Sequence, residues 1–263
     1  MAGSTQVVEI DGHRIKLSNL EKVLYPEDEI IKAEVIQYYL KIAPYFLRHN
    51  KYRPLSLVRY PDGISSHEFF QKDRPSWAPD WIESIRLGKE EKKDYIFLTN
   101  AASLVWLANL ACLELHIMEF TKQDPDHPDL MVFDLDPAPE MSFDQVKQIA
   151  YLLKEHLLEF EYHPFVKTSG GKGLHLFCPI APSNSHGEVF QAAKDLSESF
   201  IKKYPQLGTL QLRKDKREQK LLIDIYRNRE TQTVVGAYSL RGKPGAPVSM
   251  PVSWETLGDI KSS

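Results

Sequence analysis

Apolar and polar positions follow strand and helix periods in turn along most of this 263-residue chain. A hairpin is predicted over residues 7–17, because alternating apolar residues flank Asp11-Gly12, a dipeptide that favours hairpin turns. Apolar runs predict further strands, and apolar residues recurring every three or four positions predict helices. The strands are expected at 55–58, 130–136, 165–167, 174–178 and 221–225, and the helices at 32–47, 101–112 (after Asn100 as N-cap), from 142, 186–203 and 253–257.

The order of these elements indicates the fold class. Helices alternate with single strands and with one pair of strands, which argues for an α/β protein with a mixed sheet covered by helices. The length allows one large domain or two closely joined lobes. No repeat or low-complexity linker interrupts the chain.

Composition narrows the possibilities only slightly. The 33 Lys and Arg residues nearly balance 36 Asp and Glu residues, giving a net charge of −3, so any polyanion site must come from local clusters such as residues 214–217. There is no apolar run long enough to span a bilayer and no secretory pattern at the start, so we expect a cytoplasmic protein without a membrane partner. Cys112 and Cys178 lie in apolar surroundings and are expected to be buried, reduced thiols.

The most informative stretch is the apolar run that ends at Asp134-Leu135-Asp136-Pro137. Alternate side chains of a strand share a face, so both carboxylates point the same way while Leu135 points into the core. Pro137 cannot donate to a strand ladder and is expected to end the strand, with the acids at its tip. Two carboxylates at this spacing reach one divalent cation or bridge two.

A second apolar run contains Asp224, which needs a partner or a metal if it is buried. A neighbouring arginine such as Arg227 is one possible partner. Together with Asp134 and Asp136, however, Asp224 favours a three-carboxylate metal site. Oxygen ligands suit Mg²⁺ or Mn²⁺, whereas zinc would need closely spaced His or Cys ligands, which are absent from the sequence. Carboxylates that hold two such cations are typical of phosphoryl transfer.

Two further segments carry groups that suit phosphate. Between predicted strands, Ser169-Gly170-Gly171-Lys172-Gly173-Leu174-His175 combines backbone N–H groups with a hydroxyl, an ammonium and an imidazole. It lacks the spacing of a Walker A loop, and a plain hairpin turn is the alternative. In Tyr238-Ser239-Leu240-Arg241-Gly242-Lys243, Arg241 and Lys243 could clamp a triphosphate, or the segment could be a solvated loop. Combined with the aspartates, these segments indicate a nucleoside triphosphate.

These motifs together resemble the polymerase domain of bacterial ligase D, in the archaeo-eukaryotic primase superfamily. The resemblance rests on five segments in the family's order and covers roughly residues 7–257. The segments are Asn19-Leu20-Glu21-Lys22-Val23-Leu24-Tyr25-Pro26, Phe133-Asp134-Leu135-Asp136-Pro137, the glycine segment from Ser169 to His175, Ile223-Asp224 and Tyr238-Ser239-Leu240-Arg241. The resemblance implies one primase-polymerase domain over 1–263, with an N-terminal α/β lobe over about 1–120 and an RRM-like catalytic lobe over about 121–263.

The resemblance also implies roles for individual residues. Asp134, Asp136 and Asp224 would be the catalytic metal ligands for two Mn²⁺ or Mg²⁺ ions, with Asp224 mainly on the ion that activates the attacking hydroxyl. His116, Ser169, Lys172, His175 and Arg241 would bind the nucleotide, although His116 by itself is more typical of a core-facing histidine on a helix. The DNA and its 5′-phosphate would contact Lys22, Lys32, Arg53, Arg59, Phe69, Phe70, Lys72 and Arg217, of which the two phenylalanines could instead be ordinary core or surface residues and Arg217 part of a solvated loop.

The activity implied by the resemblance is template-directed nucleotide addition in prokaryotic non-homologous end joining, with a preference for ribonucleotides over deoxynucleotides and for Mn²⁺. Its substrates would be gapped or 3′-overhang DNA ends with a 5′-phosphate, and Ku and a separate DNA ligase are possible partners of such a nucleoid-associated enzyme. Two alternatives are a primase that starts chains de novo and a module that bridges DNA ends without chemistry.

Overall fold

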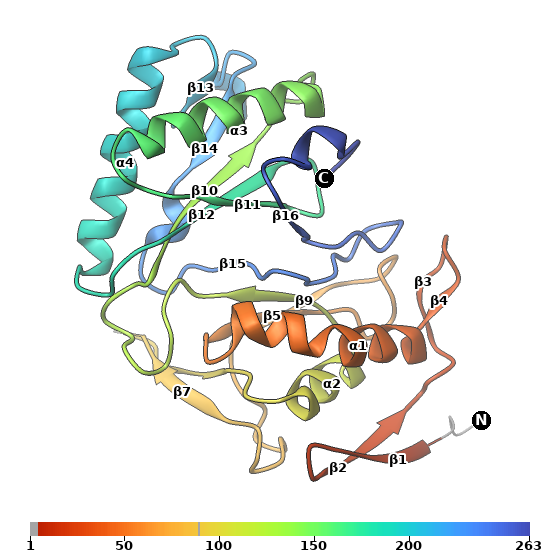
Figure 1. Cartoon of the computed structure of the whole chain (residues 1–263). Helices are drawn as coiled ribbons and strands as arrows, with labels where there is room; N and C mark the ends of the chain where they lie inside the picture. Colours follow the sequence, from red (N-terminus) through yellow and green to blue (C-terminus); the bar gives the residue numbers. More distant parts are fainter. Residues whose placement is uncertain (1–4, 89) are drawn as a thin grey trace. The chain divides into compact units, whose positions relative to one another are not determined.

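The computed structural model describes residues 5–88 and 90–263, which form two compact units. The first unit comprises Met1–Met118 and Val235–Val248, and the second comprises Glu119–Val234 and Ser249–Ser263. The chain therefore crosses between the units three times, and a short C-terminal segment returns to the first unit before the chain ends in the second (Figure 1).

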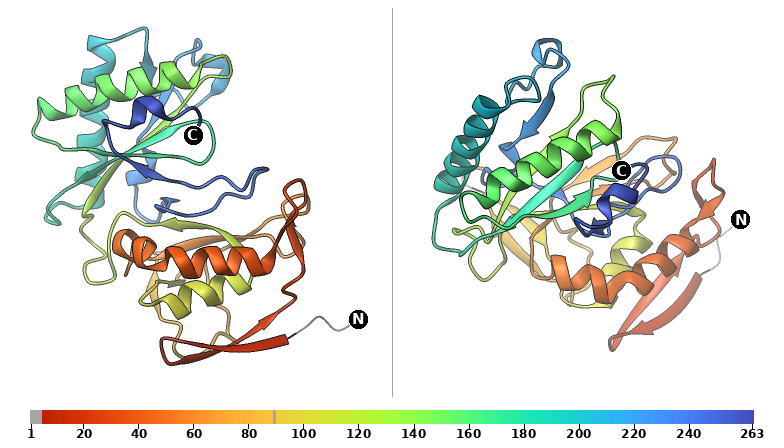
Figure 2. Two further views of the ribbon diagram at one scale, coloured as in Figure 1. Left: turned by 45° about the vertical axis from the view of Figure 1, so that its right-hand side comes forward. Right: turned by 45° about the horizontal axis from the view of Figure 1, so that its top comes forward.

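The first unit contains small sheets and two helices. A sheet in the order β15-β9-β5-β6 is packed with α1 and α2, and three two-stranded ribbons complete the unit (Figures 1 and 2). Its elements are β1 (Thr5–Ile10), β2 (His13–Ser18), β3 (Val23–Tyr25), β4 (Ile30–Ile31), α1 (Lys32–Asn50), β5 (Leu55–Arg59), β6 (Phe69–Gln71), β7 (Ser84–Leu87), β8 (Lys93–Ile96), α2 (Ala101–Asn109) and β9 (Cys112–Ile117), with β15 (Val234–Val235) at its boundary.

The second unit is a six-stranded sheet covered on one face by α3 and α4 (Figures 1 and 2). The strand order is β13-β14-β10-β12-β11-β16, and all neighbours are antiparallel except the β13–β14 pair. Its elements are β10 (Leu130–Asp136), α3 (Phe143–Leu158), β11 (Phe165–Thr168), β12 (Leu174–Pro179), α4 (His186–Lys203), β13 (Gly208–Thr209), β14 (Leu221–Asp224) and β16 (Pro251–Val252), with the 3₁₀ turns η1 (Lys214–Lys216), η2 (Tyr226–Asn228) and η3 (Leu257–Asp259).

Side-chain alternation on β10 explains how this unit is layered. Met131, Phe133 and Leu135 are fully buried in one hydrophobic core, which also contains residues of both covering helices. Asp134 and Asp136, at the intervening positions, therefore lie on the opposite face of the sheet. The predicted mixed α/β architecture and the predicted pair of strands around the glycine segment are both confirmed.

Helix starts follow the capping rules. Ser142 accepts the backbone N–H of Gln145 at 3.3 Å, and the Gln145 side chain accepts the N–H of Ser142 at 2.8 Å, which forms a capping box for α3. Asn100 accepts the N–H of Ser103 at 2.8 Å, so the predicted N-cap of α2 is confirmed.

The end of α2 and the last predicted helix differ from expectation. The prediction of a helix over 101–112 is wrong, because α2 ends at Asn109 and Cys112 already starts β9. Ala111 takes a left-handed conformation with φ 56°, which stops the helix and reverses the chain. His116 consequently lies on a strand. The helix expected at 253–257 is only the short 3₁₀ turn at Leu257–Asp259.

Two absences concern the described residues only. None of their helices has the length and apolar character needed to cross a membrane. Cys112 and Cys178 are buried and form no disulfide, as predicted.

Candidate metal and nucleotide site

Three carboxylates meet on the open face of the six-stranded sheet. Asp134 on β10 and Asp224 on β14 are direct partners in the antiparallel ladder, and Asp136 follows two residues after Asp134. One carboxylate oxygen from each of the three aspartates lies within 4.8 Å of the others. The sequence predicted that Asp134 and Asp136 share a face; the ladder brings Asp224 to them.

Burial and mutual repulsion shift the acidities of this group. Burial, followed by the charges of Asp134 and Asp224, raises the pKa of Asp136 to about 6. Burial also raises the pKa of Asp224, although Arg227 opposes this. For Asp134, burial acts in the same direction, but His175, Arg227 and Lys167 outweigh it and hold the pKa at about 2. The face therefore concentrates negative charge that a cation would stabilise.

A row of basic side chains backs Asp134. His175 on β12 places Nε2 3.2 Å from Asp134 Oδ1, and Lys167 on β11 places Nζ 2.8 Å from His175 Nδ1. These residues are cross-strand neighbours in successive ladders, Asp134 opposite His175 and His175 opposite Lys167. Because the Lys167 ammonium donates to Nδ1, the proton of a neutral His175 lies on Nε2 and faces Asp134.

Arg227 bridges two of the carboxylates. Its guanidinium lies 3.3 Å from Asp224 Oδ2 and 3.5 Å from Asp134 Oδ2. Both readings of Asp224 offered by the sequence therefore hold together, since the side chain is paired with Arg227 and also belongs to the three-carboxylate group. The Arg227 side chain is partly exposed, and it compensates charge that would otherwise be buried.

The glycine segment makes a compact turn beside this row. Ser169 Oγ accepts the backbone N–H groups of Gly171 and Gly173 at 3.1 and 3.2 Å, so the hydroxyl organises the turn itself. A Cβ on Gly173 would lie 2.0 Å from the carbonyl oxygen of Leu135, so only glycine fits against the strand that carries the aspartates. Lys172 is exposed at the tip of the turn.

The first unit holds a second polar cluster, around Glu114 on β9. His116, two residues further along the same strand face, lies 2.9 Å from Glu114 Oε2, and Arg241 Nε lies 3.1 Å from the same oxygen. The sequence singled out His116 and Arg241 separately and missed the buried Glu114 that holds both. The alternation of Glu114 and His116 along one strand was the available signal, and the interpretation of His116 as a helix residue concealed it.

Basic and aromatic side chains of the first unit lie as follows. Phe69 and Phe70 are more than half exposed on β6, with the Arg59 guanidinium and the Lys72 ammonium each 5.8 Å from one of the rings. Burial, and then the charges of Lys22 and Arg59, lower the pKa of Lys32 to about 8. Lys32 is buried and donates to Ser18 O at 2.7 Å, whereas Lys22 is paired with Asp62.

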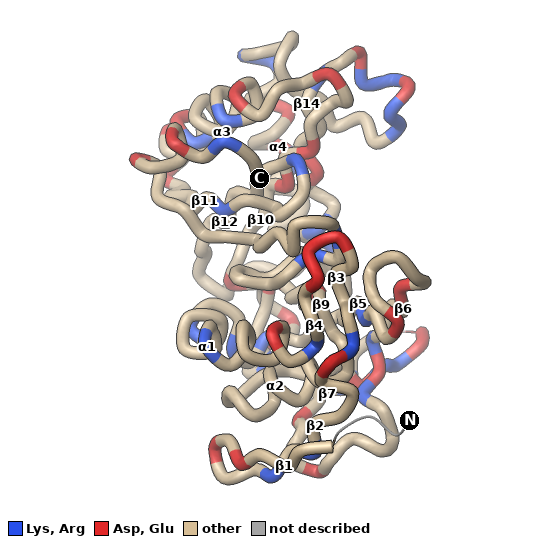
Figure 3. The backbone as a smooth tube through the Cα atoms, turned by 90° about the vertical axis from the view of Figure 1, so that its right-hand side faces the viewer, with Lys and Arg blue, Asp and Glu red and all other residues tan. Residues whose placement is uncertain are grey.

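Two arginines that were predicted to contact DNA donate hydrogen bonds to backbone carbonyl oxygens of this chain. The Arg53 side chain donates to the carbonyl oxygens of His49 and Met118, and Arg217 donates to those of Gln211 and Leu212 at 3.1 and 2.9 Å. Both residues are buried, so each stabilises a chain turn. Their contact with DNA stays a prediction. Lys and Arg positions are spread over both units rather than gathered in one block (Figure 3).

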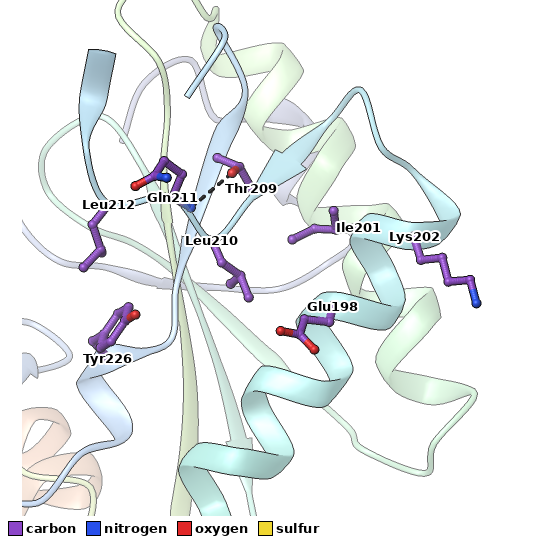
Figure 4. A pocket seen from close by; sticks show the side chains of 8 residues that line it. All are labelled: Glu198, Ile201, Lys202, Thr209, Leu210, Gln211, Leu212 and Tyr226. Carbon is purple, nitrogen blue, oxygen red and sulfur yellow. Dashed lines mark hydrogen bonds between the residues drawn. The ribbon is translucent and has the colours of Figure 1, made fainter. Parts of the chain in front are cut away.

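An open pocket of about 660 Å³ lies elsewhere in the second unit, between α4 and the segment after β13 (Figure 4). Its walls mix apolar and polar side chains: Glu198, Ile201, Lys202, Thr209, Leu210, Gln211, Leu212 and Tyr226. The lining includes none of the three aspartates, so we do not count this pocket as part of the candidate site.

The donor set of the three-aspartate group fits a hard divalent cation. It offers carboxylate oxygens only, at mutual distances that one ion or an adjacent pair of ions can span. The excess negative charge, expressed in the raised pKa of Asp136, is what a bound cation would relieve. Among the described residues this is the one such group of acidic, histidine or cysteine side chains.

Comparisons with known proteins show the family of this chain. The family model described as "LigD, primase-polymerase domain" matches residues 31–263. The chain is 32% identical over 249 residues to the multifunctional non-homologous end joining protein LigD of Mycolicibacterium smegmatis, covering 94% of this chain and 33% of that protein. It is 31% identical over 245 residues to the bifunctional LigD of Bacillus subtilis, covering 93% of this chain and 39% of that protein. The chain thus spans between a third and two fifths of these relatives.

One solved structure is similar to this chain over most of the length of both. The polymerase domain of Mycobacterium tuberculosis ligase D, in complex with DNA, superposes with a TM-score of 0.89 at 30% identity, covering 94% of this chain and 89% of that one.

Proposed function

The chain belongs to the LigD primase-polymerase domain family, and from that premise we propose that it is a DNA-repair polymerase that adds nucleotides at broken DNA ends. More specifically, we propose template-directed gap filling in non-homologous end joining, with ribonucleotides preferred over deoxynucleotides. The observation that carries the proposal is the meeting of Asp134, Asp136 and Asp224 on one sheet face, beside the glycine turn, in a chain of this family.

The reaction we propose joins the 3′-oxygen of a primer to the α-phosphorus of a nucleoside triphosphate. The bond between that phosphorus and the bridging oxygen of pyrophosphate breaks, and the hydroxyl proton passes to solvent. Two Mn²⁺ or Mg²⁺ ions held by the three aspartates would supply charge neutralisation at the attacking and leaving oxygens. The chain's own contribution is positioning in a preorganised field.

Residues of each unit have a part in this proposal. In the second unit, His175 and Arg227 hold Asp134 and Asp224 in place, and Lys172 with the backbone N–H groups of the glycine turn would bind phosphate. Ser169 would act mainly by shaping that turn. In the first unit, His116 and Arg241 would contact the nucleotide.

We also propose that Lys22 and Lys32 recognise a 5′-phosphate on the far side of a gap. The support is electrostatic: burial lowers the pKa of Lys32 most, and the charges of Lys22 and Arg59 lower it further, so three cationic side chains are close enough to interact and could together attract an anion. Phe69 and Phe70, exposed beside Arg59 and Lys72, would stack on bases of any sequence. Arg53 and Arg217 would assist through the loops that they stabilise.

The remaining parts of the proposal follow from the family alone. Relatives are named as non-homologous end joining proteins, so Ku and a DNA ligase are the partners that we propose for this chain, at the bacterial nucleoid in the cytoplasm. A primase that starts chains de novo remains a second candidate within the same superfamily.

The decisive experiment measures nucleotide addition on a gapped duplex with Mn²⁺, with ribo- and deoxynucleotides in parallel and with the 5′-phosphate present or absent. Templated addition that favours ribonucleotides and increases with the phosphate supports the proposal. Addition that is indifferent to the phosphate favours the primase, and DNA binding without addition favours an end-bridging module.

Two variants sharpen this experiment. Asp134→Ala with Asp136→Ala should abolish addition while DNA binding survives, because charge repelling the DNA is removed; persistent addition would refute the metal assignment. Lys22→Ala with Lys32→Ala should remove the phosphate preference and lower the salt dependence of binding. Lys194→Ala with Lys202→Ala on α4 is the matched control, since it removes the same charge from the second unit.

A further inference from the structure

Glu114 is a buried carboxylate whose two oxygens both have partners. Oε2 faces His116 Nε2 at 2.9 Å and Arg241 Nε at 3.1 Å, while Oε1 accepts the backbone N–H of Gly242 at 2.9 Å and the Tyr60 hydroxyl at 3.5 Å. The Tyr60 hydroxyl has one proton and lies closer to Glu68 Oε2, at 3.1 Å, so the main partners of Glu114 are His116, Arg241 and the backbone of Gly242.

The surroundings keep this side chain ionised. Burial alone would raise the pKa of Glu114, but the hydrogen bond from His116, the charge of Arg241 and the N–H of Gly242 hold it at about 2. A buried charge that costs desolvation is tolerated only where its partners are in good geometry. The carboxylate thus holds two side chains that the family resemblance assigns to the nucleotide.

The segment that carries Arg241 is fixed from several sides. The Tyr25 hydroxyl donates to Arg241 O at 2.9 Å, and the Arg241 N–H donates to Pro247 O at 2.9 Å. A Cβ on Gly242 would lie 2.1 Å from the Tyr60 ring, so the ring packs directly against the backbone of this turn. These contacts hold the backbone around Arg241 in place. The ion pair with Glu114 sets the direction of the Arg241 guanidinium.

We infer that Glu114 is a positioning residue that orients Arg241 and His116 toward the nucleotide, without touching the nucleotide itself. This inference rests on the proposed function, because it concerns the same nucleotide. Sharing one carboxylate oxygen places the imidazole and the guanidinium side by side, as recognition of adjacent phosphate oxygens requires. Their orientation is set before the substrate arrives, so no free energy of binding is spent on ordering them.

The test compares steady-state nucleotide addition by the wild type and Glu114→Gln. The neutral amide cannot hold both the imidazole and the guanidinium on one oxygen, so KM for the nucleoside triphosphate should rise about tenfold or more, as when a charge-assisted hydrogen bond is misaligned. We expect kcat to change much less than KM. Glu68→Gln is the matched control, because it removes a carboxylate that contacts the same Tyr60 hydroxyl but neither His116 nor Arg241. An unchanged KM in Glu114→Gln would overturn the inference.

Two further variants separate positioning from charge and from folding. Glu114→Asp keeps the charge but withdraws the carboxylate by one methylene, so KM should rise here too; a wild-type KM would reduce the role to charge compensation and overturn positioning. If Glu114→Gln does not fold, as judged by thermal unfolding, Glu114→Asp and Tyr60→Phe carry the test, with the smaller rise in KM expected for Tyr60→Phe.

A double-mutant cycle shows whether Glu114 acts through Arg241. In an Arg241→Met background, Glu114→Gln should add little to the rise in KM, because the side chain that it orients is gone. If the rise in KM of the double variant equals the product of the two single-variant rises, Glu114 and Arg241 act independently and the inference is overturned. A wild-type protein that adds no nucleotide on any substrate would instead refute the proposed function, so the two failures are distinguishable.

Discussion

Asp134 and Asp224 face each other directly across the β10–β14 ladder, so the middle of the sheet carries two opposed carboxylates. Like charges in this position destabilise a sheet. The compensation comes from His175 on the next strand and from Arg227, which contacts both aspartates. The arrangement sacrifices stability for a concentrated negative field, as expected at a functional site.

Removing the third carboxylate should stabilise the metal-free protein. Burial and the charges of Asp134 and Asp224 raise the pKa of Asp136 to about 6, above its ordinary 3.8. Between these values the folded protein binds more protons than the unfolded chain, so stability falls as pH rises from about 4 to about 6 and remains lower above it. Asp136→Asn should therefore raise the free energy of unfolding at pH 8 by about 1 kcal/mol, after allowance for solvent at this partly exposed side chain.

Urea unfolding with EDTA at pH 4 and pH 8 measures this effect. The variant should lose the share of the pH dependence that Asp136 contributes, so its stability should fall less than that of the wild type from pH 4 to pH 8. It should also lose much of the stabilisation that Mn²⁺ gives to the wild type. Equal stability of variant and wild type at pH 8 would contradict the electrostatic account.

Glu114 should give the opposite pH dependence. Its pKa in the folded protein, about 2, lies below the ordinary 4.5, so its stabilising contribution is complete above pH 4.5 and is lost as pH falls toward 2. The shift corresponds to about 3 kcal/mol. Glu114→Gln should flatten the loss of stability between pH 5 and pH 2.5, measured by chemical unfolding, whereas the control Glu68→Gln should keep the wild-type slope.

Glycine at position 173 should be irreplaceable. A Cβ there would lie 2.0 Å from Leu135 O, so Gly173→Ala must displace the strand between Asp134 and Asp136. We expect a loss of about 1–3 kcal/mol in stability and a larger loss of nucleotide addition. Gly187→Ala in α4 is the control. Apart from its chain neighbours and the helix backbone, the nearest atom to the added Cβ would be Ser185 Oγ, 3.9 Å away, and alanine favours the helix. Thermal unfolding and nucleotide-addition assays on both variants test this. Wild-type stability and activity in Gly173→Ala would contradict the prediction.

Phe69 and Phe70 should contribute to DNA binding without contributing to stability. Their side chains are 54% and 55% exposed, so their truncation removes little buried surface. Phe69→Ala with Phe70→Ala should weaken binding to gapped DNA by about 1–3 kcal/mol per stacked base. Phe165→Ala, at a 67% exposed position on β11, is the control. Fluorescence anisotropy with a labelled gapped duplex measures the difference; equal affinities would refute the stacking role.

Local patterns determined much of this protein. The alternation that puts Asp134 and Asp136 on one face, the strands around the glycine turn and the α/β class are properties of neighbouring residues, because strand and helix periods are set by the backbone. The family resemblance rests on the same short motifs and their order. These parts of the prediction agree with the structure and with the family comparison.

The tertiary structure decided which distant residues meet. Asp224 joins Asp134 only through the register of a ladder that closes a long loop, and Glu114 meets Arg241 across 127 positions of sequence (241 − 114). Arg53 and Arg217 show no local sign that backbone carbonyls would bind them. A left-handed Ala111 likewise ended a helix that the apolar pattern continued. Periodicity reports which way a side chain points, whereas partners depend on strand pairing and packing between distant segments, which carry no local signature.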